Sequence, residues 1–136
     1  MIPILWNHSF SVQIPEIDEQ HRKLLDIFNK LNQAIIEGHE KEILMEILQE
    51  LEDYTRYHFE FEESFIAANN LPGLEPHRTL HRRLIEELKD YREKFYRQRW
   101  GLSRSLNSFL RSWFLNHILT HDKKYALALH KKRETP

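Results

Sequence analysis

The sequence predicts an all-α protein, an up-down-up-down four-helix bundle with an extended N-terminal arm. Its 136 residues suit one domain, 1–136, and contain only three Gly and five Pro, too few for the tight turns of an all-β fold. Glu, Lys, Leu and Arg, which favour helices, are abundant. Four segments carry apolar residues at helical spacing, and short breakers separate them. Such helices pack as an antiparallel bundle.

The chain begins with the predicted arm, residues 1–17, in which two prolines disfavour a long helix. The first helix is expected over about 18–37, with Asp18 as its N-cap and Gly38 at its end. One side of this helix faces inward. Its members have helical spacing: His21, Leu24, Leu25, Phe28, Leu31 and Ile35.

The second helix is expected over about 41–68. Its inward face consists of Leu44, Ile47, Leu48, Leu51, Thr55, His58, Glu62 and Phe65. The segment 69–76 contains Asn, Pro and Gly and is a clear breaker. Pro76 suits the first turn of the helix that follows, because a proline there removes no helical hydrogen bond.

The third helix is expected over about 76–97, with His77, Leu80, His81, Leu84, Leu88, Tyr91 and Phe95 on one face. Trp100 and Gly101 break the chain again, and Ser103 can cap a fourth helix over about 103–129. The apolar face of that helix changes register midway. It starts with Leu106, Leu110, Trp113 and His117 and continues, shifted by one residue, with Asp122, Tyr125 and Leu129.

Composition excludes several classes of function. The formal net charge is −1 with both signs interspersed, so the sequence offers no basic face for nucleic acid or acidic lipid. The absence of cysteine excludes disulfides, thiolate nucleophiles and iron–sulfur sites. No segment approaches the roughly 20 apolar residues that span a bilayer, and the N-terminus lacks the pattern of a signal peptide. We therefore expect a cytoplasmic protein that is a monomer.

Polar residues interrupt every inward face. A buried polar group without a partner costs a few kcal/mol, so these groups need a common partner, and a metal supplies one. His58 and Glu62 are four residues apart, as are His77 and His81, so each pair projects from one helix face. The complete candidate set draws five imidazoles and two carboxylates from all four helices: His21, His58, Glu62, His77, His81, His117 and Asp122.

This set is too large for one structural zinc ion, which takes four ligands. It suits two metal ions bridged by two carboxylates, with the five imidazoles divided three and two. Together with one small bridging oxygen species, the first ion would reach six ligands and the second five. The second ion would then keep an open position, and an open position on a redox metal is where a small molecule binds.

These residues resemble the hemerythrin family, specifically the stand-alone bacterial hemerythrins. The resemblance covers nearly the whole chain, and its most specific motifs are Ile-Asp-Glu-Gln-His at 17–21, His-Phe-Glu-Phe-Glu-Glu at 58–63, His77 with His81, and the segment 113–122. It implies two iron ions with a bridging oxo or hydroxo group. Residue by residue, it implies the following set: His77, His81 and His117 on one iron, His21 and His58 on the other, and Glu62 and Asp122 bridging both.

Spacing and resemblance disagree at one position. In an ideal α-helix His121 shares a face with His117, whereas residues five apart diverge by about 140°. The resemblance selects Asp122 instead. A π-type widening over 117–122 would reconcile the two, and the register shift of the apolar face supports it. We therefore expect His121 beside the site or at the surface.

The resemblance implies reversible dioxygen binding for storage, transport or delivery to an oxygen-consuming enzyme, and no enzymatic activity. An imidazole-rich centre also favours a carrier, because di-iron enzymes of the Glu-x-x-His type use more carboxylates. Two alternatives share the same site. A sensor of oxygen, redox state or nitric oxide needs a separate partner, and an enzyme that scavenges peroxide or nitric oxide needs sustained turnover with a reductant. A purely structural metal would be redox-silent.

The remaining polar and aromatic neighbours are less informative. Phe59, Trp113 and Ile118 flank candidate ligands and either line an oxygen pocket or belong to the ordinary core. Three further histidines receive no role, since they fall in the arm, a loop and the tail: His8, His39 and His130.

Overall fold

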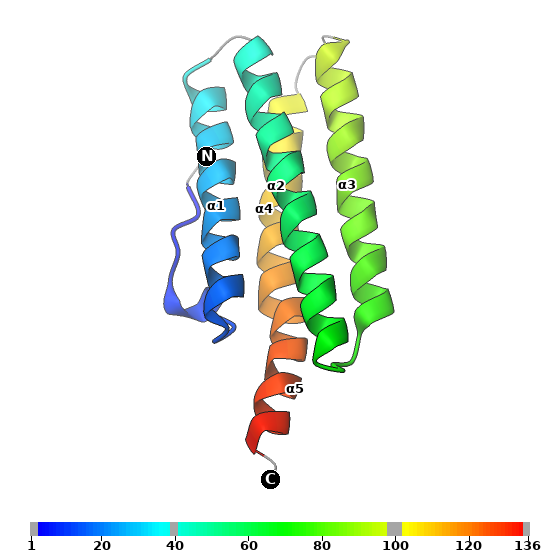
Figure 1. The fold of residues 1–136 in the computed structure, drawn as a ribbon. Coiled ribbons are helices and arrows are strands. Elements are labelled where there is room, and N and C mark those ends of the chain that lie inside the picture. Colours follow the sequence, from blue (N-terminus) through cyan, green and yellow to red (C-terminus); the bar gives the residue numbers. More distant parts are fainter. Residues whose placement is uncertain (1–2, 39–40, 98–101, 135–136) are drawn as a thin grey trace.

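The computed structural model of the chain describes residues 3–38, 41–97 and 102–134. Within them four long helices run antiparallel to their neighbours along the chain and form one bundle (Figure 1). The helices are α1 (Pro15–Ile36), α2 (Lys41–Ala68), α3 (Leu74–Tyr96) and α4 (Leu102–Asn116). The last continues through a π-helical turn, η2 (His117–Asp122), into α5 (Lys123–Glu134). No strand occurs in these ranges, and the predicted all-α four-helix bundle is confirmed.

The start of the first helix differs from the prediction. Helix α1 begins at Pro15 with Ile14 as its N-cap, so Asp18 lies inside the first turn and the expected capping role is wrong. Proline at the first helical position has no N–H to satisfy, which favours this earlier start. The Asp18 carboxylate instead holds the arm. It accepts hydrogen bonds from the Val12 N–H at 2.8 Å and from the Ser11 hydroxyl at 2.6 Å.

The inward faces of the helices build the core largely as predicted. Their apolar members are buried, and some are fully enclosed, such as Phe28, Leu51, Leu106 and Leu110. Other predicted members lie at the edge and are half-buried: Ile35, Leu44, Phe65, Leu80, Phe95 and Trp113. The fourth helix starts at Leu102, one residue before the predicted cap Ser103, and its N-cap position lies outside the described residues.

Two apolar clusters lie on either side of the buried polar residues. The larger includes Leu24, Phe59 and Ile118, and the smaller includes Ile17, Ile66 and Tyr125. In the sequence of α1, of α2 and of the η2–α5 segment, one candidate ligand therefore lies between a residue of the larger cluster and a residue of the smaller cluster. The polar layer is thus enclosed by apolar side chains from both ends, which limits the access of water to it.

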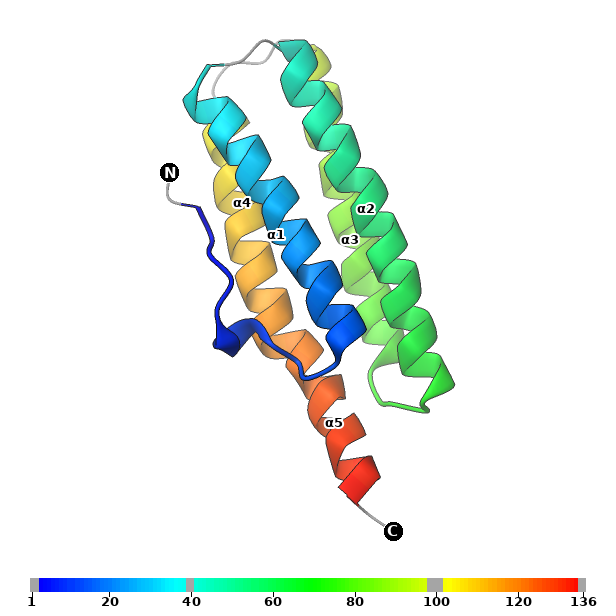
Figure 2. The same cartoon turned by 60° about the vertical axis from the view of Figure 1, so that its left-hand side comes forward.

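The N-terminal arm, with the short 3-10 turn η1 (His8–Phe10), lies against α1 and contacts η2 (Figure 2). The Ile4 N–H donates to Oδ1 of Asn29 at 2.9 Å, and the Asn29 amide donates to the Ile4 carbonyl at 2.8 Å. The Arg22 guanidinium lies 4.8 Å from the centre of the Trp6 ring, a cation–π contact. One asparagine of α1 thus satisfies both backbone groups of an arm residue.

Asn29→Ala is expected to detach the arm and lower the free energy of unfolding by about 1–3 kcal/mol, because both polar groups of Ile4 lose their partner. Urea denaturation measures the loss, and limited proteolysis should show earlier cleavage within the arm. Lys23→Ala, an exposed change on the same helix, is the control and should leave both readouts unchanged. Equal stability of the two variants would contradict this role of Asn29.

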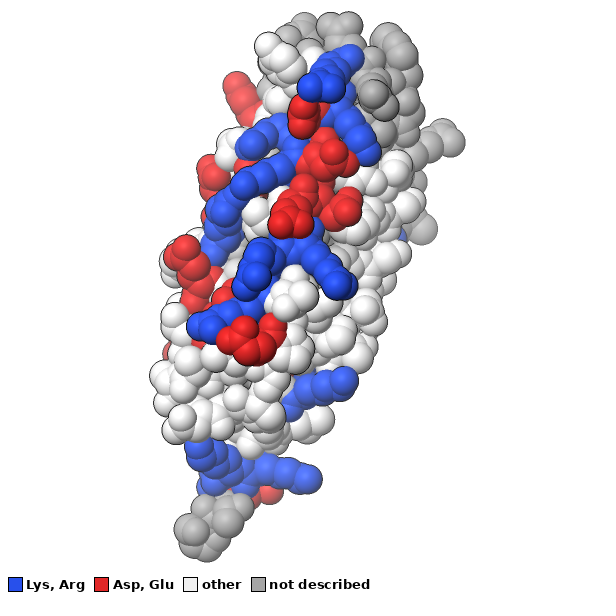
Figure 3. Space-filling model, turned by 90° about the vertical axis from the view of Figure 1, so that its right-hand side faces the viewer, with Lys and Arg blue, Asp and Glu red and all other residues white. Residues whose placement is uncertain are grey.

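The surface carries charges of both signs. On the face formed mainly by α3, Lys and Arg alternate with Asp and Glu over much of the helix (Figure 3). Several of these charges form ion pairs along the helix, such as Lys94 with Asp90 at 2.8 Å and Arg97 with Glu93 at 2.7 Å. Among the helices described here, none combines the length and the apolar character that a membrane span requires.

Candidate metal centre

All seven candidate residues meet in the polar layer of the bundle. His21 comes from α1, His58 and Glu62 from α2, His77 and His81 from α3, and the remaining two from η2, namely His117 and Asp122. Each of the seven is at most 5% exposed. Side chains that are distant in sequence are thus brought together where water is excluded.

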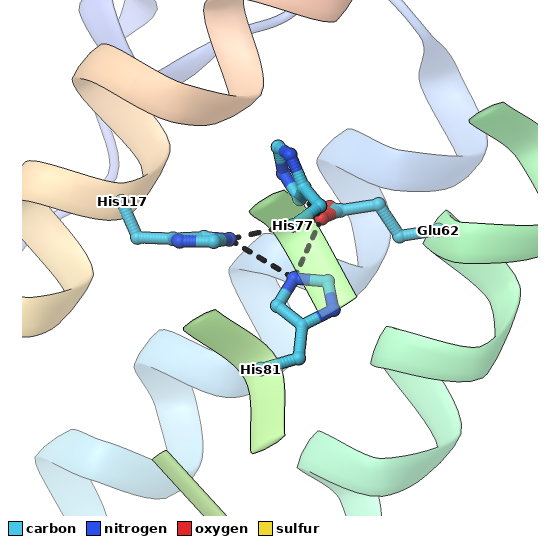
Figure 4. Close-up of side chains that lie close together, drawn as sticks. All are labelled: Glu62, His77, His81 and His117. Atoms are coloured by element: carbon cyan, nitrogen blue, oxygen red, sulfur yellow. Dashed lines mark hydrogen bonds and ion pairs between the residues drawn. The ribbon is translucent and has the colours of Figure 1, made fainter. Parts of the chain in front are cut away.

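The first group contains three imidazoles and Glu62, which point to a common centre (Figure 4). Oε1 of Glu62 lies 3.0 Å from Nε2 of His81, 3.1 Å from Nε2 of His77 and 3.7 Å from Nε2 of His117. The Nε2 atoms of His81 and His117 are themselves 3.1 Å apart. Three imidazole nitrogens therefore converge around one carboxylate oxygen.

The second group contains His21, His58 and both carboxylates. Nε2 of His58 lies 3.2 Å from Oε2 of Glu62. Nε2 of His21 lies 3.0 Å from Oδ2 of Asp122 and 3.7 Å from Oε2 of Glu62. This group has two imidazoles where the first has three.

Each carboxylate divides its two oxygens between the groups. Oε1 of Glu62 faces the three-imidazole group, and its Oε2 faces the other. Asp122 does the same, because its Oδ1 lies 2.8 Å from His77 and 2.9 Å from His117, while its Oδ2 faces His21. Both carboxylates therefore occupy the position from which one side chain can bind to two centres.

Some of the candidate ligand atoms also lack a hydrogen-bond partner in the described part of the chain. Among the residues that the structure describes, three of these fully buried ligand atoms form no hydrogen bond: Nε2 of His21, Oε1 of Glu62 and Oδ2 of Asp122. A buried polar atom without a partner is costly, and its presence at a site calls for an ion or water. Imidazole and carboxylate donors at this spacing fit a non-haem metal site.

The π-helical turn explains how His117 and Asp122 meet. Its i→i+5 hydrogen bonds widen the helix, so residues five apart reach the same side, as the register shift predicted. His121 belongs to neither group, although its ring centre is 5.7 Å from that of His117. It is partly exposed and lines a surface cavity, which confirms its expected place beside the site.

Aromatic rings hold two of the imidazoles in place. Phe59 stacks on His81 with ring centres 3.6 Å apart and planes inclined by 2°. Trp113 stacks on His117 at 4.3 Å and 11°. Phe59 and Ile118 are buried, and Trp113 is half-buried, so these three residues contact the site and also belong to the core or its edge.

Sequence reasoning missed the residues that contact the ligands from behind. Nδ1 of His58 donates to Oε1 of Gln20 at 2.7 Å, and Nδ1 of His81 donates to Oε2 of Glu63 at 2.9 Å. The Tyr125 hydroxyl donates to Oε2 of Glu62 at 3.1 Å. Gln20 and Glu63 each adjoin a candidate ligand and belong to the motifs at 17–21 and 58–63, but the motifs do not indicate which atoms these side chains contact.

The histidines without a predicted role lie away from the site where they are described. His8 is exposed, and Nε2 of His130 donates to the Val12 carbonyl at 3.3 Å, which links α5 to the arm. His39 lies outside the described residues.

The charges of the cluster shift its pKa values in a consistent way. Burial lowers the pKa of His21 and of His77, but the neighbouring carboxylates outweigh it and raise both values to about 9. Burial raises the pKa of Glu62 and Asp122, but the surrounding imidazoles outweigh it and hold both well below their usual range. Burial lowers the pKa of His58. The metal-free cluster therefore pairs two carboxylates with imidazolium groups.

These shifts predict how the stability of the metal-free protein depends on pH. The unfolded-state pKa of histidine is 6.5, so the stability from His21 and His77 is complete below pH 6.5 and is lost as pH rises through about 9. We expect chelator-treated protein to be less stable at pH 9.5 than at pH 6.5, by on the order of 3 kcal/mol at most for each imidazole. Urea denaturation at the two pH values measures the difference.

His77→Gln is expected to reduce this pH dependence, and His130→Ala, outside the cluster, serves as the control that keeps it. Metal-loaded protein should not show the loss, because the cation replaces the protons between the carboxylates. A flat stability profile for the metal-free wild type over this range would contradict the assigned charges.

A surface cavity of about 530 Å³ lies next to the three-imidazole group. Its lining includes His77 and Tyr125, which contact the site, and His121 and Lys124, which are nearer to solvent. Pro72, Gly73 and Pro76, from the turn before α3 and its first turn, complete one side of this cavity. The cavity therefore adjoins the site on the side of α3 and α5.

Comparison with known proteins gives a consistent result. A family model described as the hemerythrin HHE cation binding domain matches residues 12–129. A bacteriohemerythrin of Stenotrophomonas maltophilia is 30% identical over 126 residues, which are 93% of this chain and 81% of that protein. Another, of Clostridium acetobutylicum, is 30% identical over 128 residues, with coverage of 89% and 97%.

The fold agrees with the sequence comparison. A crystal structure of wild-type hemerythrin matches with a TM-score of 0.85 and 26% identity, and the match covers 94% of this chain and 98% of that one. The matched family model also spans every residue of the buried cluster. The chain therefore belongs to the hemerythrin family.

Proposed function

We propose that the protein holds two iron ions and binds dioxygen reversibly, for storage, transport or delivery to an oxygen-consuming enzyme. The observation that carries this proposal is the division of each carboxylate between two unequal groups of imidazoles. A single structural ion would need neither two shared carboxylates nor five imidazoles. The family to which the chain belongs supports iron over other metals that accept the same donors.

In this proposal each residue has a defined part. His77, His81 and His117 hold one iron, His21 and His58 hold the other, and the two carboxylates hold both. With one bridging oxygen species counted, an iron held by three imidazoles would have six ligands and an iron held by two would have five. The unequal division would therefore leave one position for a small ligand.

The iron pair, when bound, supplies two electrons to dioxygen and recovers them when dioxygen leaves. The protein contributes ligand geometry and enclosure. Phe59 and Trp113 stack on the imidazoles and hold their orientation, and the apolar clusters above and below the site exclude water. Exclusion of water protects the reduced iron pair from irreversible oxidation.

Charge favours a carrier over an enzyme. Two ferrous ions contribute +4, and two carboxylates with one hydroxide contribute −3, so the reduced centre carries about +1. Additional carboxylates would neutralise this charge and favour higher-valent iron. The five neutral imidazoles of this chain keep the centre slightly positive, and the Glu-x-x-His pairs of carboxylate-rich di-iron bundles do not occur among the candidate ligands.

The direct test is a visible spectrum of iron-loaded protein that is reduced without air, exposed to oxygen and then purged with inert gas. We expect two irons per chain and a colour that appears with oxygen and disappears on purging. Immediate and permanent oxidation would overturn the carrier function in favour of a sensor or an enzyme. Iron that shows no spectral change would overturn redox function altogether.

A further inference from the structure

The imidazole of His81 lies between two consecutive glutamates of α2. Its Nε2 is 3.0 Å from Oε1 of Glu62, inside the candidate centre, and its Nδ1 donates to Oε2 of Glu63 at 2.9 Å, outside it. A neutral imidazole has one N–H, so donation from Nδ1 leaves the lone pair on Nε2, the atom that faces the centre. Glu63 therefore fixes the tautomer that a metal ligand needs.

The corresponding contact in the other group is uncharged. Nδ1 of His58 donates to the amide oxygen of Gln20 at 2.7 Å. Within the residues that the structure describes, Nδ1 of His21 and Nδ1 of His117 have no hydrogen-bond partner. The three-imidazole group thus includes a ligand that is hydrogen-bonded to a carboxylate, and the two-imidazole group includes one that is bonded to a neutral amide.

Glu63 is itself held in place. Its Oε1 lies 3.3 Å from Nε of Arg78, which also pairs with Glu75 at 2.6 Å. The Glu63 side chain is 23% exposed and lines a cleft of about 180 Å³ between α2 and α3. On the ring itself, Phe59 stacks on His81, so the imidazole is oriented by an aromatic face and by a carboxylate.

We propose that Glu63 is a positioning residue that makes His81 a stronger electron donor and thereby makes the two ions of the centre unequal. A carboxylate that accepts from Nδ1 increases the basicity of the ligating nitrogen. It therefore stabilises ferric relative to ferrous iron in the three-imidazole group. Gln20, a neutral acceptor, gives the other group no such bias, so the ion with the open position is the more easily reduced of the two. This inference rests on the proposed two-metal centre.

Glu63→Gln tests the inference, because the amide keeps the size of the side chain and an oxygen acceptor but removes the charge. Titration of metal-free protein with Co²⁺ alone is expected to show one of two binding constants reduced about tenfold, with the other unchanged. In iron-loaded protein, one of two reduction potentials should rise. A tenfold change in the ferric-to-ferrous affinity ratio equals about 59 mV for one electron.

Two backgrounds identify which ion responds. In a His21→Ala protein, which keeps the three-imidazole group complete, Glu63→Gln should still lower the remaining Co²⁺ affinity. In a His117→Ala protein it should have no effect on the remaining affinity. Gln20→Glu is the reciprocal change and should lower the potential of the other iron, and Glu60→Gln, in the same cleft, is the matched control without effect.

Identical Co²⁺ constants and potentials in wild type and Glu63→Gln would overturn the inference. So would an equal weakening of both ions together with a lower melting temperature, because that result indicates a structural role alone. If wild-type protein bound neither Co²⁺ nor Fe²⁺, the two-metal function itself would be wrong. The outcomes therefore distinguish an incorrect role for Glu63 from an incorrect two-metal function.

Discussion

Replacing Glu62 with alanine is expected to remove both metal ions from the protein. Its two oxygens face different imidazole groups, so the change takes one donor from each group at once. In the proposed centre the change would also remove one of the three negative charges that offset the four positive charges of two ferrous ions. Loss of a residue that merely supports a ligand reduces metal affinity 10- to 100-fold, and loss of a shared ligand should exceed that.

Metal analysis after gel filtration measures this effect, with two ions per chain expected for wild type and only background for Glu62→Ala. Glu62→Gln provides a control for the cavity that alanine creates, because an amide of equal size cannot replace a bridging carboxylate and should also lose metal. Glu60→Ala, an exposed change on the same helix, should retain both ions. Retention of two ions by Glu62→Ala would exclude the bridging role.

Asp122→Ala should abolish the oxygen-dependent spectrum, whereas His121→Ala should leave it intact. Asp122 is fully buried, and its oxygens lie within 3.0 Å of imidazole nitrogens of three helical segments. His121 lies at the edge of the surface cavity, and burial together with the nearby His117 lowers its pKa. Loss of one bridging carboxylate leaves the centre one unit more positive and the two ions less firmly joined.

The comparison requires equal folding of the two variants, so far-ultraviolet circular dichroism and urea midpoints should accompany the spectra. The reverse result, with the spectrum lost in His121→Ala and kept in Asp122→Ala, would contradict the assignment of Asp122 as the second bridging carboxylate. If both variants fold equally well, a difference between their spectra reflects the metal site and not the global fold.

The fold and most of the candidate residues could be predicted from the sequence because they follow short-range periodicity. Residues such as Leu24, Leu51 and Leu84 repeat every three or four positions, and the same periodicity places His58 with Glu62 and His77 with His81. Asp122 needed more than spacing. Its selection over His121 depended on resemblance and on charge, and the shifted register of Tyr125 supported a π-type widening, which the structure shows.

Other features depend on contacts that periodicity does not describe. Pro15 starts α1 earlier than Asp18 would have, because a helix start depends on which backbone groups the preceding segment leaves unsatisfied. The roles of Gln20 and Glu63 follow from which side of an imidazole each side chain reaches, a matter of packing between helices. Neither residue falls on a predicted inward face, so its role could be found only in three dimensions.

The π-helical turn sets the number of residues that separate His117 from Asp122. A π turn accommodates one residue more than an α-helical turn, so η2 amounts to a single-residue insertion within a continuous helix. Without that insertion, the histidine and the carboxylate would be four residues apart and would still share a helix face. Tyr125 and Leu129 of α5 would still lie on the same face as the carboxylate. The five-residue spacing of His117 and Asp122 is therefore a property of the helix rather than a requirement of the ions.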